Sequence, residues 1–430
     1  MKTKFFLFFL LLVAATQMKA NNMLVKNVTT TGDNAANKTI QVQFDMSWDN
    51  SWRDAINWDA AWVFMKYKDA NGNWQHVMLN TTGFANGTGT ANTIQVGSDK
   101  VGAFVYRSAA GTGTFASSTM QLQWNYGLSG LTSVTGLEIR VFAIEMVYVP
   151  QGNFTITPTF EVYKLNDNNY LQANFYAPAN NTPIINTRLS PTLTYSDRTS
   201  TATVRIKGDA GIDTDNNGTV DITTYPIGYN AFYCYKYELT EQQYADFLNT
   251  LTTTQKTTLG VAGTTIKLTN GEYFSSSPTK ACGKSTAIRL LAYADWSGVR
   301  PMSILEFNKA SNGPQMQPMS GIGNWINDNN NGANSLTSVG SFATLYTGKN
   351  DSGATYFGIM DFAGNAMEPC VKLNNYTFTN TNGNGVLGTT GATDVITWST
   401  TMILYIDYWG NNYYFSTLTY GGFRYVRSAE

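Results

Sequence analysis

The sequence is poor in charged side chains. Of its 430 residues only 13% are Asp, Glu, Lys or Arg, and 28 basic and 29 acidic residues give a net charge of −1. A chain that binds nucleic acid usually carries a strongly basic face, so we expect no nucleic-acid partner. Asn, Thr, Ser and Gly fill the polar positions instead, which is typical of an exported protein.

Histidine and cysteine are also scarce. The single histidine is His76, which we expect on the surface of a strand, and one imidazole in the N-terminal third favours no Ser-His-Asp arrangement. The three cysteines are Cys234, Cys282 and Cys370. In an oxidising compartment they permit one disulfide and one free thiol, and their spacing does not choose the pair. Their simplest interpretation is structural.

Long apolar runs are missing after the N-terminus. Lys2 and Lys4 precede an apolar run at residues 5–15, and Ala20 marks a cleavage point. This arrangement predicts a signal peptide over residues 1–20, because the run is too short to span a bilayer. We therefore expect export to the periplasm, the cell surface or the medium, and no integral membrane segment.

The first third of the chain is strand-like. Apolar side chains occupy every second position of residues 39–48, and residues 62–68 and 119–126 repeat this pattern. A period of two predicts strands that bury one face. Two such sheets must cover each other, so residues 21–145 are predicted to form an all-β sandwich.

Helices are predicted only after about residue 225. Residues 240–251 have an apolar stripe at helical spacing, and Thr240 with Gln243 forms a capping box. Residues 285–297 predict a second helix that ends at Gly298. Its expected inward side chains are Ile288, Leu291, Ala292 and Trp296.

A third helix is predicted after Ser303, where Glu306 completes another capping box. Long Gly- and Asn-rich loops and short strands follow, and residues 166–225 read as an irregular insertion. The fold class is therefore α+β, with an N-terminal sandwich followed by an irregular domain over residues 146–430.

Four motifs in the second half resemble one family. They are MVYVPQGNF at 146–154, FYCYKYELTEQQYADFL at 232–248, AYADWSGVRPMSILEFNKA at 292–310 and GIMDFAGNAME at 358–368, closed by Gly-Phe-Arg at 422–424. In this order they resemble the formylglycine-generating-enzyme, or sulfatase-modifying-factor, domain family over about residues 146–430. The resemblance implies a loop-rich fold related to C-type lectins.

The family's known chemistry does not carry over. Members that oxidise a substrate cysteine hold copper with two cysteines of the C-terminal segment, and thiolates are what copper(I) requires. No cysteine follows Val371, and Tyr425 stands directly after the Gly-Phe-Arg motif. Iron-dependent members use several histidines, which this chain lacks. We therefore expect no copper, no iron and no catalysis of the known kind.

The resemblance does imply a calcium loop. At the matching positions Asp361 and Glu368 would supply side-chain oxygens, and Gly364 and Ala366 would supply carbonyl oxygens. Calcium prefers six to eight hard oxygen ligands, which a tight loop with two carboxylates can present. The alternative is a plain turn in which Asp361 caps local amides.

The C-terminal segment is rich in aromatic rings and amides. Large rings with small polar groups are typical of binding loops and interface hot spots, although some of these rings must be core. The predicted contact residues are Tyr405, Tyr408, Trp409, Asn411, Asn412, Tyr413, Tyr414, Phe415 and Tyr420. They would contact a protein or a glycan.

Three functions remain open. The favoured one is a secreted or cell-surface, non-catalytic binding protein that uses this C-terminal face. The residue types of the segment also fit a target of a diversity-generating retroelement. The alternatives are an active enzyme of the sulfatase-modifying type with altered metal chemistry, and a structural component of an envelope assembly.

Overall fold

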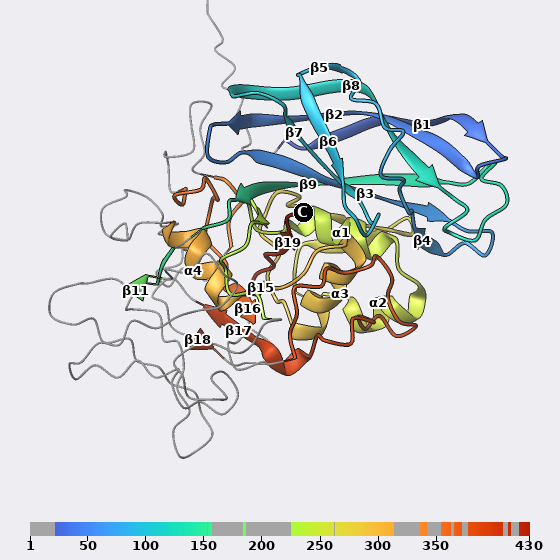
Figure 1. Cartoon of the computed structure of the whole chain (residues 1–430). Helices are drawn as coiled ribbons and strands as arrows, with labels where there is room; N and C mark the ends of the chain where they lie inside the picture. Colours follow the sequence, from blue (N-terminus) through green and yellow to red (C-terminus); the bar gives the residue numbers. More distant parts are fainter. Residues whose placement is uncertain are drawn as a thin grey trace, which may run out of the picture.

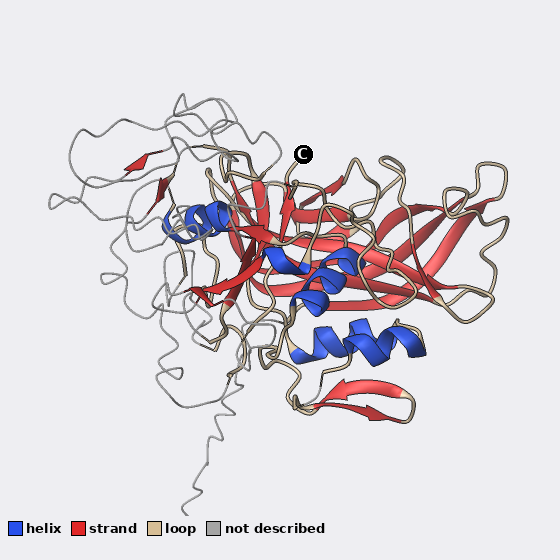
Figure 2. Cartoon of the chain, turned by 90° about the horizontal axis from the view of Figure 1, so that it is seen from below, coloured by secondary structure: helices blue, strands red, loops and turns tan. Residues whose placement is uncertain are grey.

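The computed structural model describes residues 22–152, 154–156, 184–185, 225–261, 263–313, 336–341, 354–362, 365–371, 377–406, 412–413 and 421–430. Strands dominate this part of the chain, and a few short helices accompany them (Figures 1 and 2). The expectation of an α+β chain is confirmed at this coarse level. The predicted signal peptide and almost all of the predicted insertion lie outside the described residues.

The first sheet has the strand order β1-β2-β8-β5. These strands are β1 (Leu24–Asn34), β2 (Thr39–Arg53), β8 (Gly111–Asn125) and β5 (Thr88–Gly89). The predicted alternation is confirmed in β2, where every second side chain from Ile40 to Trp48 is buried. Those side chains share a core with the second sheet, so the two sheets pack face to face.

The second sheet joins the two halves of the chain. Its strand order is β19-β12-β9-β3-β7-β6, and β4 also pairs with β3. The strands are β19 (Val426–Ser428), β12 (Phe232–Tyr235), β9 (Ile139–Val149), β3 (Asp59–Lys68), β7 (Ala103–Arg107), β6 (Asn92–Val96) and β4 (Trp74–His76). The predicted boundary between residues 145 and 146 falls inside β9. β9 pairs with β3, which precedes this boundary in the sequence, and with β12, which follows it.

Both faces of β3 are buried. Val63 and Met65 pack in the core between the sheets, whereas Trp62 and Phe64 pack in a second core with the helices. The expectation that residues 62–68 bury only one face is therefore wrong. The second half of the chain covers the other face, and a strand covered on both sides reads as a continuous apolar run.

Four helices are described, and α1 and α3 lie beneath the second sheet in Figure 1. They are α1 (Glu241–Asn249), α2 (Thr253–Leu259), α3 (Ala287–Ser297) and α4 (Ile304–Asn312). Both predicted capping boxes, at Thr240 and at Ser303, are present. Trp62 Nε1 donates to the carbonyl of Ser297 at 2.8 Å, which fixes α3 against β3.

The predicted inward face of α3 needs one correction. Ile288 is 45% exposed, and the buried side chains of the helix begin at Leu290. The first turn of α3 therefore lies at the surface, before the helix reaches the core. Gly298 ends the helix as predicted, with a left-handed φ of 73°.

Smaller sheets complete the second half. One has the order β15-β16-β17-β18, with β15 (Met302–Ser303), β16 (Glu368–Val371), β17 (Ile403–Ile406) and β18 (Asn412–Tyr413); the 3-10 helix η2 (Thr400–Met402) precedes β17. The pairs β13 (Ile266–Thr269) with β14 (Glu272–Ser275) and β10 (Thr155–Ile156) with β11 (Ile184–Ile185) are antiparallel. No helix within the described ranges is long and apolar enough to cross a membrane.

A buried ion cluster fastens the two halves together. Lys236, directly after β12, donates from Nζ to Glu145 Oε1 at 2.6 Å and to Asp59 Oδ2 at 3.3 Å. Burial raises the pKa of Glu145 to about 8, which Lys236 opposes and Asp59 reinforces. Burial alone would lower the pKa of Lys236, but the nearby carboxylate of Glu145 outweighs it and the pKa is raised.

Candidate functional site

The closing Gly-Phe-Arg motif places Arg424, whose guanidinium is buried, at the centre of the second half. Arg424 Nε donates to Glu368 Oε1 at 2.8 Å. Its Nη2 donates to the carbonyls of Met360 and Asp361, both at 3.0 Å. Its Nη1 donates to the carbonyl of Tyr235 at 3.0 Å. The second motif, the fourth motif and the closing motif of the resemblance therefore meet at one side chain.

A second carboxylate holds the loop that carries the predicted calcium ligands. Glu238 accepts from Asn365 Nδ2 at 2.6 Å and from the backbone N–H of Ala366 at 2.7 Å. Asp361 has a left-handed backbone, with a φ of 52°, and its carboxylate accepts from the N–H of Gly340. Three buried carboxylates therefore lie around the one guanidinium of Arg424.

This cluster is rich in negative charge. Burial raises the pKa of Glu368 to about 7 against the effect of Arg424. Burial, reinforced by Asp361, raises the pKa of Glu238 well above its usual range. Glu368 Oε2 is buried and has no hydrogen-bond partner among the described residues. A divalent cation would add positive charge to the cluster and would give Glu368 Oε2 a partner.

The predicted calcium ligands are only partly brought together. Asp361, Ala366 and Glu368 belong to one cluster, whereas Gly364 lies outside the described residues. Within the described ranges no three side chains of His, Cys, Asp or Glu converge as a metal ion requires. A calcium shell here would therefore depend on main-chain carbonyl oxygens as well as on the carboxylates.

The predicted ligand-binding segment is described only in part. Tyr408, Trp409, Asn411, Tyr414, Phe415 and Tyr420 lie outside the described residues. Tyr405 lies in β17, and Asn412 and Tyr413 form β18, the last strand of their sheet. Tyr405 pairs with Tyr413 across the two strands, and Ile406 pairs with Asn412.

The reactive side chains of the chain lie in its interior. Cys234, Cys282 and Cys370 are free, buried thiols, and burial raises the pKa of each. His76 is only 6% exposed, so its expected place on the surface is wrong. The neighbours that cover it include Lys66, whose Nζ lies 2.9 Å from His76 Nδ1, and the carbonyl of Val101, 2.7 Å from Nε2.

Burial, reinforced by the positive charge of Lys66, lowers the pKa of His76 well below its usual range. Lys66 in turn donates to the carbonyls of Trp296 and Gly385, at 2.8 and 2.6 Å. Lys66 therefore connects β3 to the second half of the chain, and the imidazole of His76 on β4 contacts this lysine.

The sequence motifs contained Glu238 and Arg424, but did not indicate that Arg424 lies near enough to act electrostatically on Glu238. Glu238 stands two residues before the capping residue of α1, between aromatic and apolar neighbours. A charged residue in such a run signals a buried, paired group. That signal identifies Glu238 as a candidate for the interior, although it does not identify the partner.

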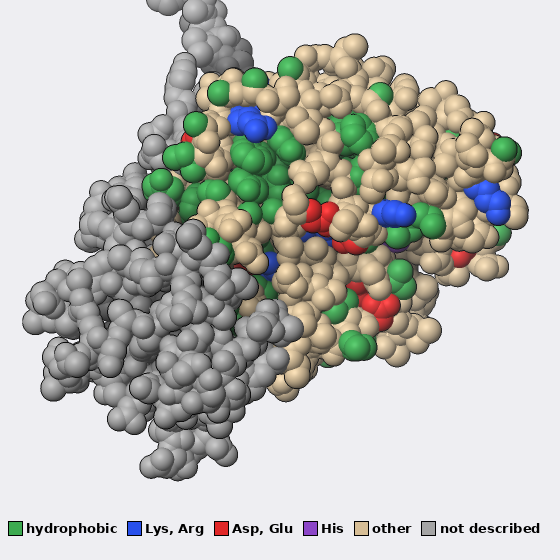
Figure 3. All heavy atoms as spheres, viewed as in Figure 1, with side chains coloured by type: hydrophobic (Ala, Val, Ile, Leu, Met, Phe, Trp, Pro, Cys, Tyr) green, Lys and Arg blue, Asp and Glu red, His purple; other side chains and the backbone are tan. Residues whose placement is uncertain are grey.

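The chain matches no protein-family model, no curated protein and no solved structure. The resemblance to the formylglycine-generating-enzyme family therefore depends on the quoted motifs, and it remains a proposal. The face shown in Figure 3 carries scattered Lys and Arg side chains among mostly uncharged atoms, in keeping with the composition.

Proposed function

We propose that the chain is an exported, non-catalytic binding protein that contacts a protein or a glycan through its C-terminal segment. In this proposal residues 1–20 direct export, and the sandwich of the first half shares its second sheet with a domain like that of the formylglycine-generating enzymes over about residues 146–430. The observation that carries it is the pairing of β17 with β18, which sets Tyr405 of β17 opposite Tyr413 of β18, the last strand of this sheet among the described residues.

A fixed strand supports this edge. β17 pairs with β16 over four residues, and all four residues of β16 are buried. Glu368, the first residue of β16, pairs with Arg424. Aromatic residues on a rigid backbone lose little conformational entropy on binding, which is why such residues dominate contact surfaces.

The surroundings of the thiols support a binding function rather than a catalytic one. A thiolate is the form that attacks a substrate or binds copper, and the raised pKa values of the three buried cysteines keep them protonated. His76, with its lowered pKa, occupies a closed hydrogen-bonded position between Lys66 and Val101. Neither group has the setting of a nucleophile or a metal ligand.

Calcium is the cofactor that we propose for the cluster around Arg424. Glu368 and Asp361 would hold it with the carbonyls of Gly364 and Ala366, and it would neutralise the excess of carboxylate charge. Its contribution would be structural, because bound calcium would keep β16, and with it the β17–β18 edge, in one conformation.

The test combines selection with substitution. The chain without residues 1–20 is screened against a displayed peptide library and an immobilised glycan panel. Ligands obtained in this way are expected to lose affinity for Tyr405→Ala and for Tyr413→Ala. Phe84→Ala removes a ring that is 37% exposed in the first half of the chain, and it should change nothing.

Equal binding by wild type and by both tyrosine variants would contradict the proposal, and so would a screen that yields no ligand. Circular dichroism spectra of all variants, compared with wild type, establish that each one folds. The comparison therefore measures recognition and not loss of structure.

A further inference from the structure

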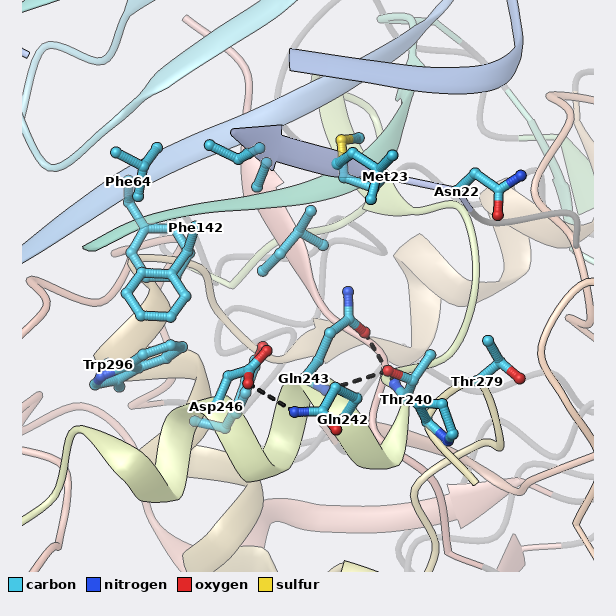
Figure 4. Close-up of a pocket in the computed structure, with 17 residues that line it drawn as sticks. Asn22, Met23, Phe64, Phe142, Thr240, Gln242, Gln243, Asp246, Thr279 and Trp296 are labelled. Atoms are coloured by element: carbon cyan, nitrogen blue, oxygen red, sulfur yellow. Dashed lines mark hydrogen bonds between the residues drawn. The ribbon is translucent and has the colours of Figure 1, made fainter. Parts of the chain in front are cut away.

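A cleft of about 500 Å³ lies on the described surface, away from the β17–β18 edge. Its walls come from the start of β1, from β9 and from α1, as Figure 4 shows. Ligand pockets of small molecules usually have about 300–1,000 Å³, mostly apolar walls and a few convergent polar groups. This cleft has a volume in that range, and both apolar and polar side chains line it.

One wall is aromatic. Phe142 of β9 is only partly buried and stacks on Phe64, with ring centroids 5.2 Å apart. Trp296 of α3 packs edge-to-face with each of these two rings, with centroids 5.0 Å apart in both pairs. Figure 4 shows the three rings at one end of the cleft. This packing holds Phe142 in place without covering it completely.

The opposite wall is polar and comes from one helix. Gln242 Nε2 donates to Asp246 Oδ1 at 2.9 Å, which orients the carboxylate. Within the described residues Asp246 Oδ2 accepts no hydrogen bond. Gln243 uses its Oε1 to cap α1 by accepting from the N–H of Thr240 at 2.9 Å, and Figure 4 shows its amide nitrogen pointing toward the strands.

The polar groups of the cleft thus include an acceptor, Asp246 Oδ2, and a donor, Gln243 Nε2, and the partly exposed ring of Phe142 lines the same cleft. Asp246 is the only charged side chain among the described residues that line it. Arg140 acts on Asp246 from outside the cleft, so a phosphate, a sulfate or an acidic peptide would find no cation among the lining side chains. A sugar has hydroxyl groups that both donate and accept, and its ring has apolar C–H faces that pack on aromatic side chains.

We propose that this cleft binds a neutral saccharide, with a sugar ring against Phe142 and sugar hydroxyls bonded to Asp246 and Gln243. The site is separate from the β17–β18 edge. We therefore expect a saccharide to bind in this cleft even if the C-terminal segment proves to bind a protein.

The experiment is isothermal titration of the chain without residues 1–20 against neutral hexasaccharides of glucose, mannose, xylose and N-acetylglucosamine. At least one is expected to bind. Phe142→Ala and Asp246→Asn should each weaken that binding tenfold or more. Gln243→Glu should also weaken that binding tenfold or more, because it removes the amide donor. It keeps the oxygen that caps α1.

Two matched controls stand outside the cleft. Phe274→Ala removes a ring that is 49% exposed on β14, and Asp33→Asn removes an exposed carboxylate near the end of β1. Both should bind the saccharide as wild type does. Tyr405→Ala and Tyr413→Ala should also leave it unchanged, which separates this proposal from the proposed function.

Three results would overturn the inference. The first is the absence of binding to every neutral hexasaccharide at millimolar concentration. The second is binding that survives Phe142→Ala and Gln243→Glu, or that depends on Tyr405 and Tyr413 instead. The third is selective binding of a lysine-containing peptide in the same cleft, because the ligand class would then be wrong.

Discussion

Replacing Lys236 by methionine tests the junction between the two halves of the chain. The side chain of Lys236 is 4% exposed, and those of its partners Asp59 and Glu145 are 0% and 1% exposed. Methionine fills most of the same space but leaves the buried Asp59 without the ammonium group that pairs with it. Breaking a buried ion pair in this way costs about 3–5 kcal/mol, so we expect a loss of that size in the free energy of unfolding.

The assay is unfolding by guanidinium chloride at pH 7, followed by the fluorescence of the ten tryptophans. The matched control is Lys68→Met, which breaks an ion pair with Glu138 whose side chains are 42% and 46% exposed. An exposed pair contributes about 0–1 kcal/mol, so this control should remain close to wild type. A loss for Lys236→Met as small as that of the control would refute the reasoning.

Four further predictions concern the cofactor, pH, backbone and chemistry. Calcium chloride should raise the melting temperature of the chain above its value in EGTA. Glu368→Gln should remove that increase, whereas the control Glu272→Gln should keep it. An increase that survives Glu368→Gln would place calcium elsewhere. Because the folded-state pKa of Glu145 is raised from 4.5 to about 8, its contribution to stability is complete below pH 4.5 and lost toward pH 8. The unfolding free energy should therefore fall by at most about 1.4 kcal/mol per pH unit from this group, and Glu145→Gln should flatten the profile. Gly298→Ala should destabilise the chain by at least about 1–2 kcal/mol, because φ is +73° and the new Cβ would lie 2.4 Å from Val101 Cγ1; an unchanged denaturation midpoint would contradict this. A peptide containing Cys-x-Pro-x-Arg should keep its mass after incubation with the chain and copper, and an aldehyde product would instead support the enzyme alternative.

Local signals predicted the helices well where packing agreed with them. The capping boxes at Thr240 and Ser303 stand before apolar stripes, and both helices formed as expected. Thr252 and Gln255 form the same capping box before α2, which was not predicted. Only Leu259 of α2 is buried, so that segment lacks the apolar periodicity by which an amphipathic helix is recognised.

Long-range packing explains what the sequence could not predict. The second face of β3 and the interior place of His76 both depend on segments more than 200 residues away, such as Trp296 and Gly385. Periodicity within β3 cannot report such a partner. The shared sheet likewise follows from the pairing of β9 with β12, for which neither strand carries a local signal.

In the candidate site, too, local patterns could be predicted and long-range contacts could not. The motifs located Asp361, Glu368 and Arg424, because these side chains stand in recognisable local patterns. The contacts of Arg424 with the carbonyls of Tyr235 and Met360 join segments far apart in the chain. The cleft beside Phe142 was not predicted at all, because α1 and β9 form it only after the two halves pack together.

Mapping a bound ligand onto the chain is the most direct test of recognition at the β17–β18 edge. A ligand from the peptide or glycan screen is given a photoreactive diazirine, irradiated in the complex, and located by mass spectrometry of the digested protein. We predict adducts on the peptide that spans residues 403–413. Adducts confined to residues 22–156, with none on that peptide, would contradict the proposed function.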